Sequence, residues 1–304
     1  MSSTPTKTLS TTISAKPGPA NHECVLPVQE YDLEATLTSG QTFNWEWSAD
    51  GWTGVVCGRC VRLQQEGSLI RARTSEPQVT WNWLEEYLQM KVNLSEVLAS
   101  FPNDPHLQLA VAACRGLRLL RQEPWECLAS FILSSTKQIV QIRQIVAMLS
   151  STFGRQVSAP GGRPAFAFPT ADRLAAVRES ELRACKMGFR APYLLATARL
   201  IADGHCDLES LRNLPLAEAR ERLMELPGVG GKIADCVLLF AFGFPEAFPV
   251  DVWVTKALSR FYFRGRRVKP SRLRSFIEMH FGPNAGYAQQ YLFHYIRTQT
   301  RGER

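Results

Sequence analysis

Two residues in the second half of the chain, Lys232 and Asp251, have the types and the spacing of a catalytic pair. An unprotonated amine is a nucleophile, and a nearby carboxylate stabilises positive charge that develops during a reaction. The apolar pattern after Lys232 predicts a helix of roughly eleven residues, about 16 Å long. The next eight residues, 243–250, span at most about 27 Å. The chain therefore has the length to return and place Asp251 beside Lys232.

Each member of this pair has a simpler interpretation when it is taken alone. Asp251 directly precedes a helical pattern that begins at Val252, so it fits the N-cap position of that helix. Lys232 alone fits a surface lysine near a phosphate. Only the two together point beyond these simpler interpretations.

A glycine-rich turn, 227–231, joins Lys232 to a helical pattern that ends at Leu226. Glycines such as Gly228 and Gly230 let the backbone approach a bulky partner and leave the first N–H groups of the next helix free to bind an anion. Taken alone, the glycines favour a plain connector between packed helices. Lys232 and Asp251 shift the balance towards a DNA-phosphate site.

The net charge of +7 is concentrated at one end of the chain. Residues 260–304 contain ten Lys or Arg and two Glu, so this segment is +8 and the first 259 residues are −1. A one-ended cluster of this kind is typical of a phosphate-binding surface. On charge alone, a solvated helical face explains it equally well.

Composition also excludes several classes of protein. No run of about 18 apolar residues exists, which excludes a membrane-spanning helix, and no apolar stretch of the secretory kind begins the chain. The eight cysteines are scattered, a pattern that predicts reduced and mostly buried thiols.

The pattern of apolar residues predicts an α+β protein. We expect a disordered tail at 1–20, an N-terminal antiparallel sheet domain with helices at 21–110 and a larger helical domain at 111–300. Strands are predicted at 31–37, 43–47, 52–56, 61–63 and 68–73. Helices are predicted from about 81 and at 124–134, 139–153, 171–177, 191–202, 216–226, 232–242, 252–263 and 270–281.

The segment LPGVGGKIADC, with the aspartate of PVD nineteen residues after the lysine, resembles the helix-hairpin-helix signature of the HhH-GPD glycosylase superfamily. More narrowly, the chain resembles the 8-oxoguanine DNA glycosylases. SGQTFNW at 39–45, LLRQEPWECLASFILSS at 119–135, MGFRAPYL at 187–194 and GPNAGYAQQYLF at 282–293 resemble segments of that family in the expected order. The resemblance covers roughly residues 23–295.

The resemblance implies a sheet domain followed by an all-α HhH-GPD domain of two helical lobes. It also implies a base-excision-repair DNA glycosylase with associated β-lyase activity that flips 8-oxoguanine out of duplex DNA. Lys232 would displace the base and form a Schiff base, while Asp251 would stabilise charge on the sugar and relay protons. The Schiff base acidifies the C2′ proton and so permits strand cleavage.

The resemblance further implies how the lesion is recognised. The carbonyl of Gly40 would accept a hydrogen bond from N7–H, which guanine lacks. Gln289 would bind the Watson–Crick edge, and Cys236 and Phe293 would sandwich the flipped ring. From the residues alone, Cys236 and Phe293 would equally fit an apolar core.

The remaining implied residues bind DNA or a cation. Phe189 would fill the gap in the duplex, and Arg190 would bond to the orphaned base. Gly228, Gly230 and Trp253 would bind phosphate. The backbone carbonyls of Met224, Leu226 and Val229 would hold a structural K⁺ or Na⁺, and no other cofactor and no iron–sulfur cluster is expected.

The chain departs from the family pattern at two places. Eukaryotic members carry an Asn-rich stretch and then an Arg that recognise the cytosine opposite the lesion, where this chain has Thr136-Lys137-Gln138 and Gln141. We therefore expect a relaxed preference for cytosine. Trp253 replaces a histidine that contacts phosphate, and its indole N–H donates one hydrogen bond but carries no charge.

Several alternatives remain to be weighed. An iron–sulfur relative requires closely spaced cysteines after the catalytic domain, and none follows Cys236. Cys57 and Cys60 lack the second pair that a zinc site needs. An alkylated-base glycosylase would share the sheet and the aspartate but not Lys232. A non-catalytic HhH DNA-binding module would have no use for the Lys232–Asp251 pair.

The expected partner is double-stranded DNA containing 8-oxoguanine. The protein is expected to be a monomer and not to bind membranes. The expected location is intracellular: the cytoplasm or nucleoid of a bacterium, or the nucleus of a eukaryote.

Overall fold

The computed structural model describes residues 21–48, 51–135, 137–161 and 164–302. The predicted disordered tail at 1–20, and Thr136, lie outside the described residues. The described part of the chain contains no helix with the length and apolar character needed to cross a membrane.

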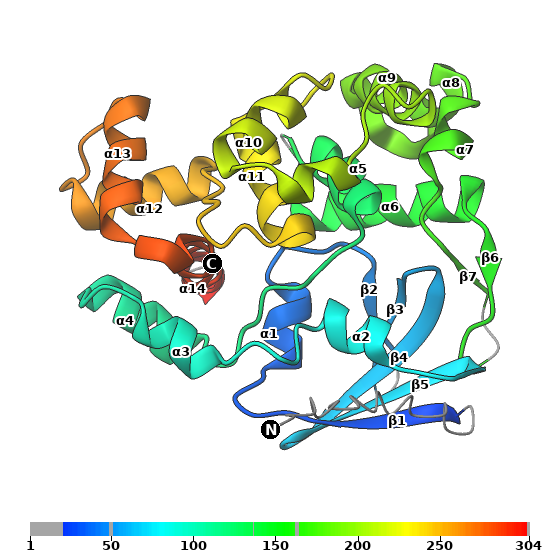
Figure 1. The fold of residues 1–304 in the computed structure, drawn as a ribbon, viewed down its shortest axis with the longest axis horizontal. Coiled ribbons are helices and arrows are strands. Elements are labelled where there is room, and N and C mark those ends of the chain that lie inside the picture. The colour runs from blue at the N-terminus through cyan, green and yellow to red at the C-terminus, as the bar shows by residue number, and fades with distance from the viewer. Residues whose placement is uncertain (1–20, 49–50, 136, 162–163, 303–304) are drawn as a thin grey trace, which may run out of the picture.

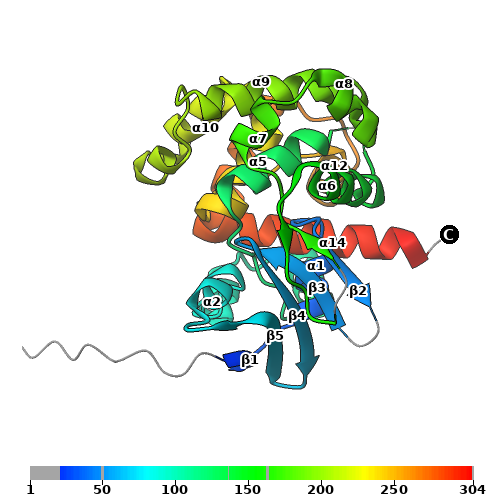
Figure 2. The same cartoon turned by 90° about the vertical axis from the view of Figure 1, so that its right-hand side faces the viewer.

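The N-terminal part is an antiparallel sheet with helices α1 (Leu33–Thr38) and α2 (Asn82–Tyr87) on its inner face (Figures 1 and 2). Within the described residues, five strands pair in the order β1-β5-β4-β3-β2. Buried and exposed side chains alternate along β5, as the two-residue period of a strand requires. The strands are β1 (Asn21–Pro27), β2 (Trp45–Ser48), β3 (Gly51–Val56), β4 (Arg59–Glu66) and β5 (Leu69–Gln78).

The predicted strand at 31–37 is wrong, because these residues form helix α1. Asp32 caps the helix by accepting a hydrogen bond from the Ala35 N–H at 2.8 Å. The alternating pattern also places Leu33 and Leu37 four residues apart, so both lie on one helical face and are buried. The true first strand, β1, lies earlier and pairs with β5 at the edge of the sheet.

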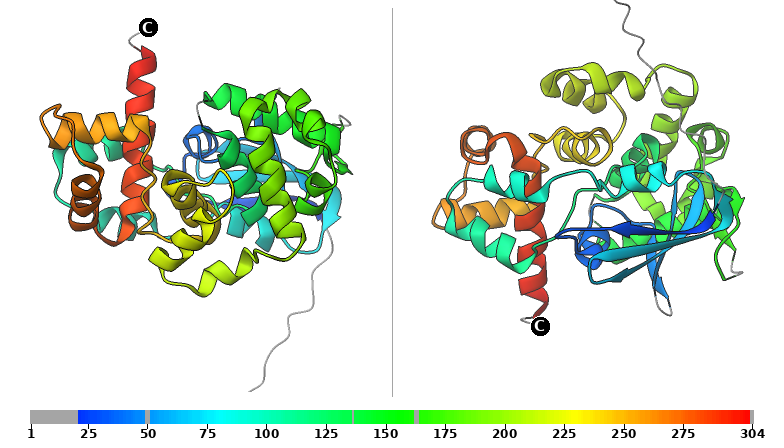
Figure 3. Two further views of the ribbon diagram at one scale, coloured as in Figure 1. Left: turned by 90° about the horizontal axis from the view of Figure 1, so that it is seen from above. Right: turned by 60° about the horizontal axis from the view of Figure 1, so that its bottom comes forward.

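The helices form two lobes, one above the sheet and one beside it (Figures 1 and 3), which confirms the α+β class. One lobe centres on α5 (Pro124–Leu133) and α11 (Gly231–Val237), and the other combines α4 (Pro105–Ala113) with α12 (Val252–Tyr262) and α14 (Ala285–Gly302). The other helical elements are α3 (Leu94–Ala99), α6 (Ile139–Phe153), α7 (Ala171–Ala175), α8 (Glu179–Leu182), η1 (Arg183–Met187), η2 (Gly188–Arg190), α9 (Ala191–Ala202), η3 (Glu209–Asn213), α10 (Leu216–Met224), η4 (Leu238–Phe242), α13 (Pro270–His280) and η5 (Gly282–Asn284). A short hairpin of β6 (Gln156–Val157) and β7 (Ala165–Phe166) follows α6 and was not predicted.

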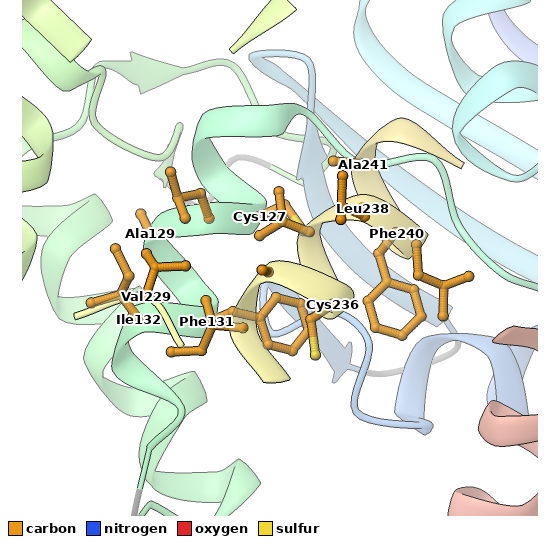
Figure 4. Close-up of a cluster of buried hydrophobic side chains, with 14 of the residues drawn as sticks. Cys127, Ala129, Phe131, Ile132, Val229, Cys236, Leu238, Phe240 and Ala241 are labelled. Carbon is orange, nitrogen blue, oxygen red and sulfur yellow. The ribbon is translucent and has the colours of Figure 1, made fainter. Parts of the chain in front are cut away.

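Helix α5 is the centre of the first lobe, and almost all of its side chains are buried. Figure 4 shows Cys127, Phe131 and Ile132 of α5 beside Cys236 of α11 and Phe240 of η4. The ring of Phe131 stacks on Phe240 with centroids 5.6 Å apart. A fully buried side chain of this size contributes about 1.5–3 kcal/mol, so this contact fixes η4, which directly continues α11, against α5.

A buried hydrogen bond between Asp104 and His280 joins α4 to α13 in the second lobe. The Asp104 carboxylate is 3% exposed, caps α4 through the N–H groups of His106 and Leu107, and accepts a hydrogen bond from His280 Nε2 at 2.7 Å. Burial raises the pKa of Asp104, but the hydrogen bonds from Leu107 and His280 lower it by more, so the net shift is downward.

This shift predicts a pH-dependent stability. A carboxyl group whose pKa is lower in the folded state stabilises the fold above its unfolded pKa, and the stabilisation is lost as pH falls through the folded pKa. We expect Asp104→Asn to lower the free energy of unfolding by about 1–2 kcal/mol at pH 7, and the deficit to shrink below about pH 4. Urea denaturation of both proteins at several pH values measures this. A deficit that stays constant down to pH 2 would contradict the assignment.

Candidate active site

A tight turn between α10 and α11 carries the glycines that the sequence singles out. Gly228 has a φ of +78°, and an added Cβ would lie 2.8 Å from Cβ of Tyr193 on α9. Gly228 is therefore required both for the left-handed conformation and for the close approach to α9. Gly230 is the N-cap of α11, and its Cα faces open space. The outer side of this turn is accessible to a large partner.

Lys232 lies in the first turn of α11, half-buried, and its side chain is held against the end of α5. Its Nζ donates a hydrogen bond to Ser134 Oγ at 3.0 Å and lies 4.9 Å from the centroid of the Phe131 ring. Ser134 Oγ in turn donates to the carbonyl of Phe131 at 2.7 Å. Because the hydroxyl proton is engaged there, a lone pair of Ser134 faces the amine.

Asp251 is the N-cap of α12, as one of the two interpretations predicts. Its Oδ1 accepts a hydrogen bond from the Val254 N–H at 2.7 Å. The described residues place no hydrogen-bond donor on Oδ2, and no ion pair joins Asp251 to Lys232. The cap therefore orients the carboxylate and leaves one oxygen available for a substrate.

Lys232 and Asp251 line the same cavity, which has a volume of about 330 Å³. Its walls come from the loop after α1, the end of α5, the start of α6, and helices α11, α12 and α14. The volume lies near the lower end of the range for small-molecule sites. The lining residues are Gly40, Phe43, Phe131, Ser134, Lys137, Gln138, Ile139, Val140, Ile142, Lys232, Asp251, Trp253, Phe293 and Arg297.

The loop that carries Gly40 is fixed by a buried amide, Gln41. Its Oε1 accepts from the Leu120 N–H at 2.8 Å, and its Nε2 donates to the carbonyls of Arg118 and Thr36 at 2.8 and 2.9 Å. Gly40 itself has a φ of +86°, and an added Cβ would lie 2.8 Å from Cδ1 of Ile139. The backbone at this cavity wall is therefore rigid and tolerates no side chain.

Helix α14 completes the wall beside Gly40. Phe293 lines the cavity, and the guanidinium of Arg297 lies 5.7 Å from the centroid of its ring. Arg297 also donates a hydrogen bond to the carbonyl of Thr38. These contacts connect α14 to the loop after α1, so the sheet and the second lobe form one wall.

Two predicted binding residues, Cys236 and Gln289, do not line the cavity. Both are buried, and each lies one helical turn from a lining residue: Cys236 from Lys232, and Gln289 from Phe293. Burial raises the pKa of the Cys236 thiol to about 12, so it is protonated at neutral pH. Among the described residues, no hydrogen-bond partner contacts Gln289 Oε1.

Phe189 and Arg190 lie on the surface next to the glycine turn. Phe189 is 54% exposed, and the guanidinium of Arg190 lies 4.7 Å from its ring centroid and 5.7 Å from that of Tyr193. Tyr193 also lies so close to Gly228 that no side chain fits between them. The aromatic side chain and the turn thus belong to one continuous surface.

The backbone carbonyls of Met224, Leu226 and Val229, which are predicted to hold a monovalent cation, keep free lone pairs in the structure. Leu226 accepts a hydrogen bond from the Val229 N–H at 3.1 Å, which leaves one lone pair free. No hydrogen bond within the described chain reaches the carbonyls of Met224 or Val229. The described residues also contain no group of three His, Cys, Asp or Glu side chains that could hold a metal ion.

Sequence reasoning missed several residues that shape the cavity. Phe131 and Ser134 position Lys232, while Ile139 and Arg297 surround Gly40. Phe131 and Ser134 fall within the quoted segment LASFILSS, but an apolar helix with a terminal serine carries no signal that it faces a lysine. Only the packing of α5 on α11 reveals it.

Comparison with known proteins agrees with this geometry. Residues 24–128 match the N-terminal domain of 8-oxoguanine DNA glycosylase, and residues 129–280 match the HhH-GPD superfamily of base excision DNA repair proteins. A probable N-glycosylase/DNA lyase of Methanothermobacter thermautotrophicus is 32% identical over 90% of this chain and 95% of its own length. The N-glycosylase/DNA lyase OGG1 of Arabidopsis thaliana is 32% identical over 87% of this chain and 77% of its own.

A solved structure shows the same arrangement of the fold. The 8-oxoguanine glycosylase/lyase of Clostridium acetobutylicum, in complex with double-stranded DNA containing cytosine opposite 8-oxoguanine, superposes with a TM-score of 0.85 and 31% identity. The match covers 91% of this chain and 98% of that one. The chain belongs to the 8-oxoguanine DNA glycosylase family of the HhH-GPD superfamily.

Proposed function

We propose that the chain removes 8-oxoguanine from duplex DNA and then cleaves the strand by β-elimination. The observation that carries this proposal is the cavity shared by Lys232, Asp251 and the rigid backbone of Gly40. A non-catalytic DNA-binding module would have no need to bring these three groups into one cavity. An alkylated-base glycosylase would need the aspartate alone.

Lys232 is the proposed nucleophile. Its unprotonated Nζ forms a bond to C1′ as the bond from C1′ to the base breaks, and the electron pair and a proton leave with the base. Ser134 directs the amine, and the free oxygen of Asp251 stabilises positive charge on the sugar. Ring opening gives a Schiff base, loss of the C2′ proton follows, and the 3′ phosphate leaves.

The wall of the cavity is the proposed site for the flipped base. The Gly40 carbonyl accepts from N7–H of the lesion and repels the N7 lone pair of guanine. Gln289 has an unpartnered buried oxygen that the N–H groups of the Watson–Crick edge would satisfy. Cys236 and Phe293 supply apolar contacts to the two faces of the ring.

The surface around the cavity is the proposed binding site for duplex DNA. Phe189 enters the space of the flipped base, and Arg190 bonds to the opposite base. Gly228, Gly230 and Trp253 bind phosphates, and a K⁺ or Na⁺ on the carbonyls of the turn would add positive charge there. The enzyme acts as a monomer without another cofactor, in the compartment that holds DNA: the nucleoid of a bacterium or the nucleus of a eukaryote.

The choice of opposite base is proposed to be relaxed. The side chain of Gln141 is engaged within its own helix, because its Oε1 accepts the Gln138 N–H at 2.9 Å. Gln141 is also uncharged, so it offers a cytosine no charged contact, unlike the arginine of eukaryotic family members.

Borohydride trapping tests the nucleophile. Two lysines, Lys232 and Lys137, line the cavity, so the single variants discriminate between them. We expect Lys232→Gln to abolish the covalent adduct with 8-oxoguanine duplex and to slow excision by about a thousandfold or more, because the attacking amine is gone. Lys137→Gln should still trap. An adduct with Lys232→Gln would reject this role for Lys232.

Gly40→Ala tests the base-binding wall. An added methyl group is strained at the φ of +86° and lies 2.8 Å from Cδ1 of Ile139, so the backbone at Gly40 shifts. We expect excision to fall by at least about tenfold, or ~1.4 kcal/mol. Gly67→Ala is the matched control, since Gly67 also has a positive φ but faces open space. Single-turnover excision measures both. Equal activity of the two variants would show that the Gly40 carbonyl is not used.

Single-turnover excision opposite C, A, G and T tests the relaxed preference. We expect the rates to lie within about a hundredfold, or ~2.7 kcal/mol, because the uncharged Gln141 stands where eukaryotic family members carry the arginine. A larger drop away from cytosine would contradict this expectation.

A further inference from the structure

Helices α12 and α13 and the loop between them carry an unusual excess of cations. Residues 252–277 contain eight Lys or Arg and no Asp or Glu, and all eight side chains are exposed. None of them forms an ion pair with another described residue. Elsewhere on the surface, arginines such as Arg71, Arg73 and Arg183 pair with glutamates. The excess is therefore a property of this surface and not of the whole molecule.

The cations on α12 continue a line that starts at the cavity. Trp253 lines the cavity, and Lys256 and Arg260 follow it three and seven residues later. At 3.6 residues per turn the three side chains lie within about 60° of one another, on the face opposite buried Val254 and Leu258. The line extends about 10 Å along the axis of α12, away from the cavity.

The loop after α12 extends this line and has a defined shape. Arg264 has a φ of +52° and Gly265 a φ of +73°, and the Gly265 N–H donates to the carbonyl of Ser259 at 2.8 Å. A left-handed residue after a helix is usually glycine or asparagine, and another residue costs about 1–2 kcal/mol. Arg266 and Arg267 follow directly. The loop thus holds exposed arginines in a fixed conformation at an energetic cost.

We infer that Lys256, Arg260, Arg264, Arg266, Arg267 and Lys269 form a phosphate track that binds duplex DNA to one side of the flipped nucleotide. This inference rests on the proposed function and deepens it, because the track begins at the cavity wall. Duplex DNA is the occupant, and not an acidic polypeptide, because the track is continuous with the wall of the cavity that a flipped nucleotide of DNA would enter. Contacts of this kind add affinity that is independent of base sequence and sensitive to salt.

The salt dependence of binding to undamaged duplex tests the track. The variant is Arg264→Gln/Arg266→Gln/Arg267→Gln, and the matched control is Arg71→Gln/Arg73→Gln/Lys91→Gln, which removes three charges from the sheet side. Each phosphate contact adds about 0.9 to the slope of log K against log salt concentration. We expect the slope to fall by about 2–3 in the track variant and to stay unchanged in the control. Circular dichroism and thermal melting confirm that both variants fold.

A second measurement locates the track on the DNA. In a Lys232→Gln background, which prevents turnover, 8-oxoguanine duplexes are shortened from one side or the other. We expect affinity to fall when one particular flank is removed, and the track variant to be insensitive to that removal. Equal salt slopes for the track variant and the wild type, or an equal fall of the slope in the control, would overturn the inference. Binding of poly-glutamate to the surface would not rescue it, because the inference commits to duplex DNA. Borohydride trapping by the wild type tests the proposed function separately.

Discussion

Helices α11 and α12 begin at the same cavity, and the chemistry of the site depends on that convergence. The first turn of α11 carries Lys232, and the N-cap of α12 is Asp251. Neither residue has a distinctive role unless both helices start there. The buried contact of Phe131 with Phe240 holds η4, the direct continuation of α11, against α5. Ser134 at the end of α5 accepts a hydrogen bond from the Lys232 amine. The core of the helical lobe therefore sets the position of Lys232, the proposed nucleophile.

In the proposed function, the N-terminal sheet adds selectivity to the pair formed by Lys232 and Asp251. Its loop after α1 carries Gly40 to the cavity, and the buried amide of Gln41 fixes that loop through three hydrogen bonds to two other segments. Gln290 and Arg297 on α14 bond to the same loop at Ser39 and Thr38. The proposed Gly40 carbonyl must accept a hydrogen bond from 8-oxoguanine and repel guanine. It needs such rigidity, because a mobile carbonyl would adapt to both bases.

The sequence predicted the long elements better than the short ones. Helices α6 and α9 begin and end where their apolar period predicts, since amphipathic segments of this length carry a strong signal. The segment 31–37 was predicted as a strand because seven alternating residues fit both periods, and the Asp32 cap and burial of Leu33 and Leu37 decide for a helix. The predicted domain boundaries near 20 and 110 stay predictions.

The candidate site was predictable only where a motif carried it. Lys232, Asp251 and Gly40 line one cavity. Lys232 and Asp251 meet through a local turn and return of the chain, whereas Gly40 comes from the N-terminal sheet domain and was placed only by the family resemblance. Ile139 and Arg297, which close the wall around Gly40, come from distant segments and depend on packing. Cys236 and Gln289 lie one turn from the lining residues, so their proposed contacts with the base depend on small movements that a sequence pattern does not describe.

The covalent bond between the protein and the sugar is the central claim, and mapping it is the most direct test. The wild-type protein is incubated with duplex that contains 8-oxoguanine, reduced with borohydride and digested, and the modified peptide is sequenced by mass spectrometry. The account predicts a single reduced sugar adduct on Nζ of Lys232. An adduct on Lys137, on the N-terminal amine or on any other lysine would contradict it.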